Sequence, residues 1–231
     1  FVGATWSYTP KIIDHAQQVN VTFLAEGSTE IERKVLTLNI YFDFFNDHLN
    51  YYSKNPVLNR GTVGKWDYYD VRDNYVIKLN NGTYAMFYTG NNGITGGVGL
   101  ALSNDNGVTW TKYKNNPLFT NGTGRDWDNK AISYGNVIKM PNGTWYAYYS
   151  GKNQTIGNKH WAIGLVTSND LVTWTKYSGN PLFTIYNTPF VDNNMVLPYV
   201  VRDKKGTYHM YWEGDRAGWT LTYANSSDGV T

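Results

Sequence analysis

Apolar and polar positions alternate along much of this chain, and short turn sequences separate the alternating stretches. Gly97–Leu102 is small and apolar, residues 103–107 form a polar turn sequence, and Val108–Tyr113 is β-branched and aromatic. This order predicts two strands joined by a turn. Gly, Asn, Thr and Tyr are frequent along the chain, which favours strands with tight turns over long helices.

The same pattern returns. Residues 162–183 nearly repeat residues 97–119, and a third copy begins at 221–231. An Asn-Pro pair begins at Asn55, Asn116 and Asn180, so the spacing is 61 and then 64 residues. Each copy also carries an apolar strand, a Gly-containing turn and an aromatic strand that ends in Gly. Four strands in each repeat predict a blade of a β-propeller, because stacked blades bury both apolar faces of a small sheet.

We therefore predict an all-β protein, a β-propeller of four-stranded antiparallel blades, with about four blades represented. Residues 1–231 are expected to form one domain. Its predicted parts are a diverged first blade (1–58), two full blades (59–119 and 120–183) and an incomplete blade (184–231).

Two stretches of the diverged blade, 19–25 and 34–45, alternate as strands do. The final repeat stops where the next residue should be Trp. Two explanations stay open: the chain is part of a longer propeller, or residues 4–10 supply the missing strand and close the ring. An open blade edge would also allow assembly with copies of the chain or with a surface structure.

Composition narrows the function. Charged residues make up 16% of the chain, against about a quarter in typical domains, and the net charge is +2 without a basic cluster. Nucleic acid is therefore not an expected partner. No apolar run is long enough for a membrane span, and there is no cysteine for disulfides or metal. The four histidines are scattered, so we expect neither a metal nor a cofactor.

The low charge and the many Asn, Tyr and Thr residues favour a secreted, extracellular protein. Six Asn-x-Ser/Thr sequences are candidate N-glycosylation sites, although this composition gives roughly four by chance. They begin at Asn20, Asn81, Asn121, Asn142, Asn153 and Asn225.

The stretches Gly82–Gly90 and Gly99–Trp110, with the Asn-Pro-Leu-Phe and Trp-Asp motifs, resemble the five-bladed propeller glycoside hydrolases. That group includes arabinanases, invertases and levansucrases, with related mannoside phosphorylases. The resemblance covers about residues 55–231. It implies a sugar site in a central funnel, where the first strand of each blade starts and the second ends. The Asn-Asp-Pro-Asn-Gly, Arg-Asp-Pro and Glu-Cys signatures of invertase-type enzymes are absent.

A second resemblance concerns a turn. The Ser, Asp, Gly, Thr and Trp spacing in residues 103–110 resembles the Asp-box of sialidases. An Asp in such a turn usually bonds its own backbone, so we expect Asp105 and Asp170 to be structural. Asp67 and Asp128 keep the repeat, and we also expect them to fix loops.

Glycoside hydrolysis needs two carboxylates, so acidic residues that break the repeat at the funnel are the candidates. Glu213 stands where the other copies have Thr89 and Ser150, and we predict that it is the general acid. Asp70 and Asp73 likewise replace uncharged residues, and either is a candidate base or nucleophile. The residues expected to contact substrate are Arg72, Tyr134, Trp212, Asp192 and Arg216.

Two functions remain open. The first is a secreted glycoside hydrolase that acts on an oligo- or polysaccharide. The alternative is a non-catalytic propeller that binds glycans or protein at a cell or filament surface. The fold alone does not decide between them.

Overall fold

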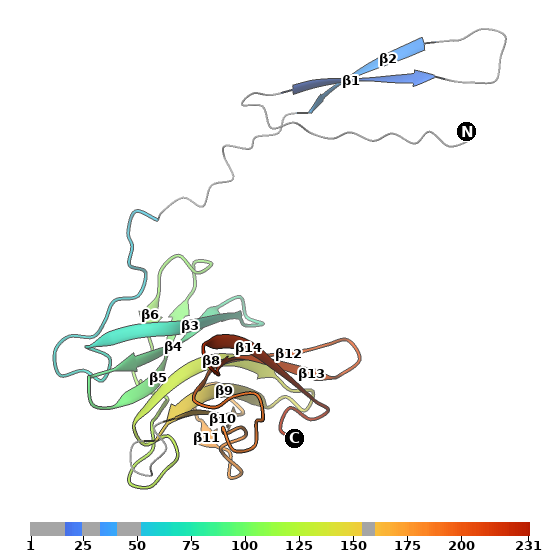
Figure 1. Cartoon of the computed structure of the whole chain (residues 1–231). Coiled ribbons are helices and arrows are strands. Elements are labelled where there is room, and N and C mark those ends of the chain that lie inside the picture. Colours follow the sequence, from blue (N-terminus) through green and yellow to red (C-terminus); the bar gives the residue numbers. More distant parts are fainter. Residues whose placement is uncertain (1–16, 25–32, 41–51, 154–159) are drawn as a thin grey trace. The chain divides into compact units, whose positions relative to one another are not determined.

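The computed structural model describes residues 17–24, 33–40, 52–153 and 160–231. The chain divides into two compact units, residues 1–53 and 54–231, and each is described by itself. In the first unit, β1 (Gln17–Leu24) pairs antiparallel with β2 (Arg33–Ile40), so both expected strands are present (Figure 1). The closing strand proposed at residues 4–10 lies outside the described residues. The diverged blade and the single domain stay predictions.

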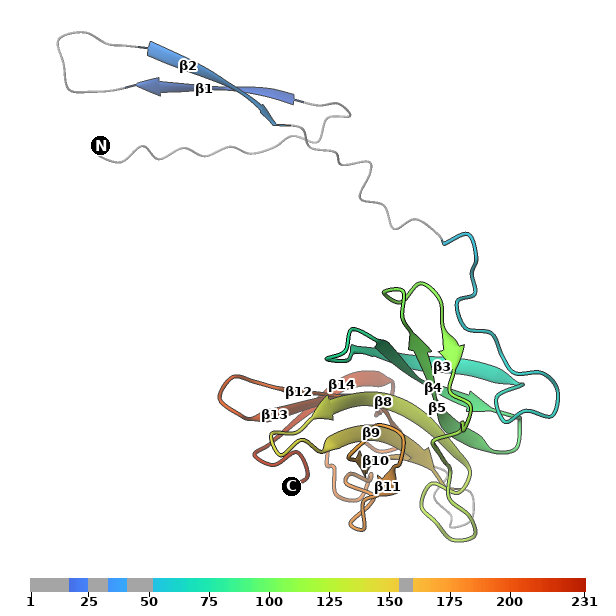
Figure 2. The ribbon, with the colours of Figure 1, turned by 180° about the vertical axis from the view of Figure 1, so that it is seen from behind.

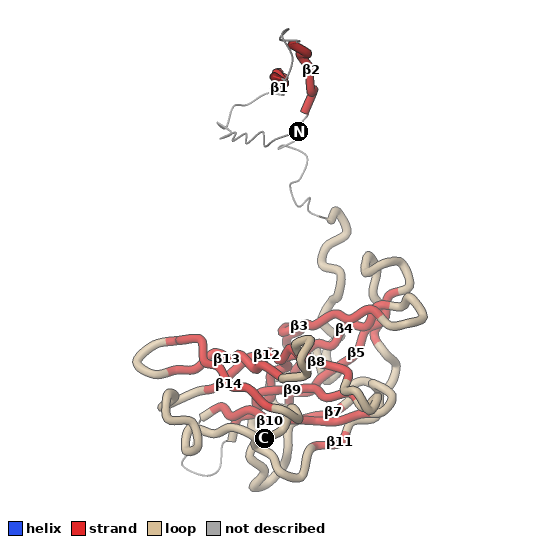
Figure 3. Tube along the Cα trace, turned by 90° about the vertical axis from the view of Figure 1, so that its right-hand side faces the viewer, coloured by secondary structure: helices blue, strands red, loops and turns tan. Residues whose placement is uncertain are grey.

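The second unit consists of antiparallel sheets, with no helix among its described residues (Figure 3). The first sheet has β3 (Asp70–Lys78), β4 (Tyr84–Asn91), β5 (Gly96–Ser103) and β6 (Thr111–Lys112), with β7 (Phe119–Thr120) also paired to β5. The second has β8 (Ala131–Lys139), β9 (Trp145–Lys152), β10 (Trp161–Ser168) and β11 (Thr175–Lys176). The third has β12 (Met195–Arg202), β13 (Tyr208–Asp215) and β14 (Trp219–Ser226). These are the expected all-β blades.

The first strands of the three sheets are neighbours, with β8 between β3 and β12 (Figures 1 and 2). This is how propeller blades place their inner strands around an axis. Each inner strand also carries a register shift, at residues 72–75 in β3, 134–137 in β8 and 196–199 in β12, which bends the strand. Asp73 in β3 and Leu197 in β12 occupy this shift with φ angles of 50° and 54°.

The second sheet is buried on both faces, as the repeat predicts. One face joins Tyr134 and Tyr149 to the first sheet's Phe87, and the opposite face joins Leu165 to Trp212 of the third sheet. Trp174 lies at the first boundary, where its ring centroid is 6.0 Å from that of Phe87. This Trp therefore packs between the first and second sheets.

The outer face of the third sheet is apolar and exposed. Tyr199, Tyr211 and Tyr223 are each almost half exposed, and Leu221 is 83% exposed. No described sheet within residues 54–231 covers this face.

The Trp-Asp motif explains why several glycines recur. Trp127 lies so close to Gly151 and Gly164 that an added Cβ would come within 2.5 and 2.4 Å of its ring. Trp66 lies in the same way against Gly90 of the first sheet. An L side chain at these glycines would displace the ring, so the first two repeats need both the Trp and the Gly.

The side chain of the Asn in the Asn-Pro motif forms the two backbone hydrogen bonds that a residue of a neighbouring strand would form. The Asn116 side chain accepts a hydrogen bond from the Leu100 N–H and donates one to the Leu100 carbonyl, at 2.9 and 2.8 Å. Asn180 bonds Leu165 in the same way. The motif therefore satisfies backbone groups of β5 and β10 that the short outer strands leave open.

Candidate functional site

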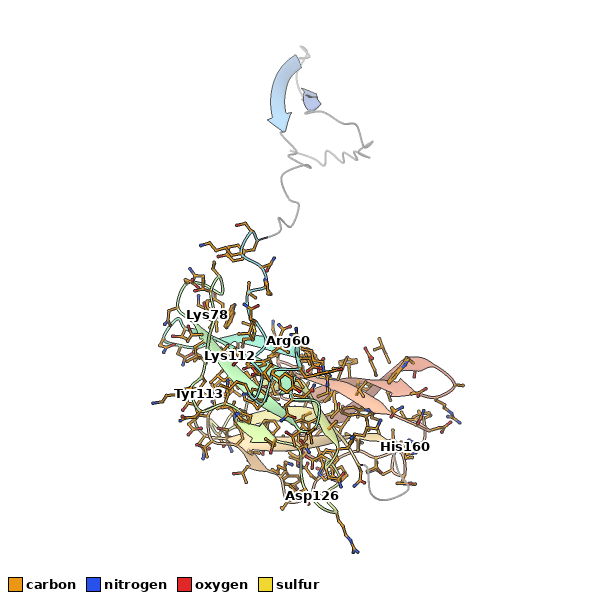
Figure 4. The ribbon with its side chains drawn as sticks, turned by 90° about the vertical axis from the view of Figure 1, so that its left-hand side faces the viewer. Arg60, Lys78, Lys112, Tyr113, Asp126 and His160 are labelled. Atoms are coloured by element: carbon orange, nitrogen blue, oxygen red, sulfur yellow. The ribbon has the colours of Figure 1, made fainter. Side chains whose placement is uncertain are left out.

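The candidate carboxylates lie at one edge of the sheets. Asp70, at the start of β3, pairs with Asn91, at the end of β4, and Met195 pairs with Gly214 in the third sheet. We call this edge, where β3, β8 and β12 begin, the rim. Figure 4 shows Lys78, at the far end of β3, and His160, beside the rim, on opposite sides of the unit. The Gly-containing turns lie at the end away from the rim.

Asp70 and Asp73 are held together by one arginine. Arg72 Nη1 is 2.7 Å from Asp73 Oδ2, and Arg72 Nε is 3.4 Å from Asp70 Oδ2. Asn91 donates a further hydrogen bond to Asp70 Oδ1 at 2.5 Å, and Ser133 donates one to Asp73 Oδ2 at 2.7 Å. The Asp73 side chain is 18% exposed and that of Asp70 34%. Both carboxylates are therefore oriented and reachable from solvent.

The position that Glu213 occupies joins blades in the other two sheets. Thr89 Oγ1 accepts a hydrogen bond from the Tyr134 N–H at 2.8 Å. Ser150 Oγ accepts one from the Leu197 N–H at 3.0 Å. Both hydroxyls are buried and connect the second strand of one sheet to the bent inner strand of the next. Glu213 places a charged group at a position that elsewhere needs only a hydroxyl.

Glu213 is half-buried, and among the described residues its carboxylate has no recorded hydrogen bond or ion pair. Arg216, three residues further along the chain, contacts Asp192, with Nε 3.2 Å from Oδ2. Asp215 is held by Asn193, which donates to its Oδ2 at 2.7 Å. The Glu213 carboxylate therefore keeps no fixed partner in the part of the chain that the structure describes.

The side chains of two predicted contact residues are packed in the core. Tyr134 is 1% exposed and stacks on Phe87, and Trp212 is 2% exposed and stacks on Phe183. Burial raises the pKa of the Tyr134 hydroxyl well above its usual range. Neither ring reaches the rim surface in this conformation, so we leave both out of the proposed contact surface.

The repeated aspartates are structural, as expected. Asp67 and Asp128 are 2% and 1% exposed and accept hydrogen bonds from the lysines of their own sheets, Lys112 and Lys176. Asp105 accepts hydrogen bonds from the Thr109 side chain and backbone, and these lower its pKa to about 2.

Sequence reasoning missed Ser133 and Asn91, which bond Asp73 and Asp70. Ser133 aligns with Arg72 in the repeat, and this break in the pattern was the available signal. Among the described residues, no three His, Cys, Asp or Glu side chains are grouped closely enough to hold a metal ion. The described part of the chain also contains no helix long and apolar enough to cross a membrane.

Comparison with known protein sequences finds two similar fungal proteins. No family model matches the chain. A protein of Aspergillus clavatus described as "Probable arabinan endo-1,5-alpha-L-arabinosidase C" is 27% identical over 141 residues, which is 59% of this chain and 40% of that protein. A protein of Emericella nidulans described as "Probable arabinan endo-1,5-alpha-L-arabinosidase A" is 27% identical over 57% of this chain and 38% of that protein. The chain thus spans about two fifths of the length of these relatives.

Solved structures share the fold. Fructan 1-exohydrolase IIa from Cichorium intybus is 20% identical with a TM-score of 0.52, over 70% of this chain and 31% of that one. An endo-1,4-beta-xylanase from Bacteroides thetaiotaomicron is 17% identical with a TM-score of 0.52, over 89% of this chain and 69% of that one. The resemblance expected from the sequence is confirmed: the chain is similar in sequence to proteins described as arabinosidases, and it shares the fold of solved propeller glycoside hydrolases.

Proposed function

We propose that this protein is a glycoside hydrolase whose reaction takes place at the rim. The observation that carries the proposal is Glu213, a half-buried carboxylate at a position that in both other sheets is a buried hydroxyl joining two blades. A residue needed only to join blades would not have to be charged. An acid on the same rim as Asp73 gives the pair of carboxylates that glycoside hydrolysis requires.

The two carboxylates have different surroundings, which suits different roles. Glu213, without a cationic partner among the described residues, acts as the general acid and donates its proton to the leaving glycosidic oxygen. Asp73 Oδ2 accepts hydrogen bonds from Arg72 Nη1 and from the Ser133 hydroxyl, at 2.7 Å each. It acts as the base that activates water or as the nucleophile that attacks the anomeric carbon. Asp70 fixes Arg72 from the other side.

Arabinan is the first substrate to test, because the two relatives found by sequence comparison are described as arabinan endo-1,5-alpha-L-arabinosidases. We also propose that the protein is secreted and carries N-glycans on exposed turns. Asn81 and Asn142 lie on such turns. Asn121 and Asn153 are 8% and 9% exposed and donate hydrogen bonds to backbone carbonyls, so they suit glycan attachment poorly.

The test is the release of sugar from linear arabinan, fructan and xylan by the parent protein and by the Glu213→Gln and Asp73→Asn variants. Release by the parent from at least one glycan, and its loss in both variants at unchanged circular dichroism, is the expected result. If both variants still release sugar, Glu213 and Asp73 are not the catalytic carboxylates.

One observation favours the non-catalytic alternative. Arg72 contacts both Asp70 and Asp73, and this arrangement would also hold a loop without any reaction. If the parent binds a glycan in the same assays, releases no sugar and keeps its affinity in both variants, a glycan-binding propeller is the better description.

A further inference from the structure

A second feature of the rim lies on the second sheet, away from the candidate carboxylates. Four segments meet there: the loop before β8, the residue that follows β9, the start of β10 and the loop that begins at Pro181. They enclose a cavity of about 190 Å³. Its principal lining residues are Arg125, Trp127, Asn153, His160, Trp161 and Tyr186.

We propose that this pocket, named here the Trp161 pocket, binds one sugar residue of a glycan without cleaving it. The volume is below the roughly 300–1,000 Å³ of pockets that enclose drug-sized ligands, so it fits a single ring better than a chain. The proposal goes beyond hydrolysis at Glu213, because it concerns a separate contact with the carbohydrate.

The repeat shows that the pocket is particular to the second blade. Trp161 pairs with Lys152 at the start of β10, and at the same place in the first sheet Gly96 pairs with Asn91. In the first blade, Asn121 accepts a hydrogen bond from the Gly96 N–H at 2.8 Å. Counted from the Asn-Pro pairs, the positions of Asn121 and Gly122 are taken by Ile185 and Tyr186 in the second blade. Small or bonded residues are thus replaced by large apolar and aromatic ones around a hollow.

The main aromatic surface of the pocket is fixed before any ligand arrives. The backbone N–H of Trp161 donates a hydrogen bond to Asn194 Oδ1 at 3.3 Å, and Lys152 Nζ lies 5.8 Å from the centre of the Trp161 ring. His160 Nδ1 is 2.9 Å from Asn193 Oδ1. The backbone of Trp161 and the His160 ring are thus held in place and Lys152 contacts the Trp161 ring, so less freedom is lost on binding, which favours affinity.

The chemistry of the lining suits a sugar. The rings of Trp161 and Tyr186 offer apolar faces to the C–H groups of a sugar, and Tyr186 is 72% exposed. Arg125 and His160 offer polar groups for hydroxyls. The described residues that line the pocket include no Asp or Glu. Since hydrolysis needs two carboxylates, the pocket suits binding and not cleavage.

A polar network connects the pocket to the region of Glu213. Asn193, which bonds His160, also donates to Asp215 Oδ2 at 2.7 Å, and Asp215 is two residues from Glu213. A polysaccharide bound at the rim carboxylates would therefore meet an ordered surface that continues to the Trp161 pocket.

Binding is measured apart from catalysis, in the Glu213→Gln background, by native affinity electrophoresis in gels that contain linear arabinan, inulin or xylan. Trp161→Ala and Tyr186→Ala are each expected to weaken retardation by the preferred glycan about tenfold, the scale of one lost stacking contact. Trp161→Tyr keeps an aromatic face and should retain most of the affinity.

Trp219→Ala is the matched control. Trp219 is the first residue of β14, pairs with Asp215 as Trp161 pairs with Lys152, and is 59% exposed, but it does not line the pocket. It should leave retardation unchanged. The proposal would be wrong if no glycan retards the Glu213→Gln protein. It would also be wrong if the addition of Trp161→Ala leaves the retardation unchanged. Neither result depends on whether Glu213 and Asp73 catalyse hydrolysis.

Discussion

Ser133 of the second sheet donates a hydrogen bond to Asp73 of the first, with 2.7 Å between Ser133 Oγ and Asp73 Oδ2. The bond crosses the boundary between two blades at the rim, and Ser133 is only 4% exposed. A candidate catalytic carboxylate is therefore positioned in part by the neighbouring blade.

Replacing Ser133 by Ala tests this contact. A buried hydrogen bond to a charged group contributes more than a neutral one, so we expect the free energy of unfolding in urea to fall by about 1–2 kcal/mol. Hydrolysis should fall as well, because Asp73 loses one of the two groups that orient it. Ser133→Thr keeps the hydroxyl and should restore both quantities. Equal stability and activity in Ser133→Ala and the parent would show that the bond does not position Asp73.

The buried aspartate of each Trp-Asp motif gives a second prediction. Asp128 is 1% exposed and accepts hydrogen bonds from Lys176 Nζ at 2.6 Å and from the Tyr149 hydroxyl at 3.0 Å. The Lys176→Met variant leaves this buried carboxylate without its cation. Because the Lys176 side chain is about one third exposed, we expect a loss of about 2–3 kcal/mol, below the range for a fully buried pair.

The exposed pair of Asp192 and Arg216 is the control, with side chains 64% and 52% exposed. Asp192→Asn should change the free energy of unfolding by no more than about 0.5 kcal/mol, since surface pairs contribute little. Urea unfolding followed by tryptophan fluorescence measures both variants. A similar small loss in Lys176→Met would mean that solvent replaces its contact with Asp128.

Aspartates in the turns after β5 and β10 make the stability of the fold depend on pH in the acidic range. Hydrogen bonds from Thr109 lower the pKa of Asp105 to about 2, and hydrogen bonds from the Thr173 and Val172 backbone lower that of Asp170 to about 2. A pKa below its unfolded value of about 3.9 stabilises the fold above that pH, and the stabilisation is lost as the pH falls from about 4 to 2. The urea midpoint should therefore decline over this interval.

Asp105→Asn isolates one turn. The amide oxygen still accepts the hydrogen bond from Thr109 but does not titrate, so the decline between pH 4 and 2 should become shallower. Stability at pH 7 should be somewhat lower, because the charge-assisted bond is lost. An unchanged pH profile in Asp105→Asn would exclude Asp105 as a source of the acid sensitivity.

The sheets of residues 54–231 were predictable because the sequence repeats the groups that build them. Trp127 needs Gly164 beneath its ring, and Asn180 bonds the backbone of Leu165, so these residues recur at fixed distances. Local turn chemistry and alternation then give the strands. The repeat also marked Glu213 correctly as a departure from Ser150.

The side chains of the site were less predictable. Tyr134 shares the place of Asp73 in the repeat, but its side chain packs in the core. Asp73 has a φ angle of 50° at the strand bend, and Tyr134 is not among the described residues with positive φ. Sequence alignment does not show which residue of a bend takes the left-handed conformation, and this conformation decides where the side chain points. The Trp161 pocket was missed because its walls come from four separate segments.

Glu213 gives the sharpest test, since the repeat itself supplies the control. If Glu213 only joined blades, as Ser150 does through its 3.0 Å bond to the Leu197 N–H, the Glu213→Ser variant would be an adequate replacement. If Glu213 is the general acid, both Glu213→Ser and Glu213→Gln lose the proton donor. We then expect at least about a hundredfold lower kcat, the lower range for general acid catalysis, with little change in stability.

The pH profile of kcat and the choice of leaving group also distinguish a general acid at Glu213 from a residue that only joins blades. Loss of the acid should remove the alkaline limb of the kcat profile, because no group remains whose deprotonation stops the reaction. An aryl glycoside with a good leaving group needs less protonation, so its hydrolysis should fall much less than that of a natural glycan. Full activity in Glu213→Ser on both substrates would assign Glu213 to the joint between blades, and the general acid would have to be another residue.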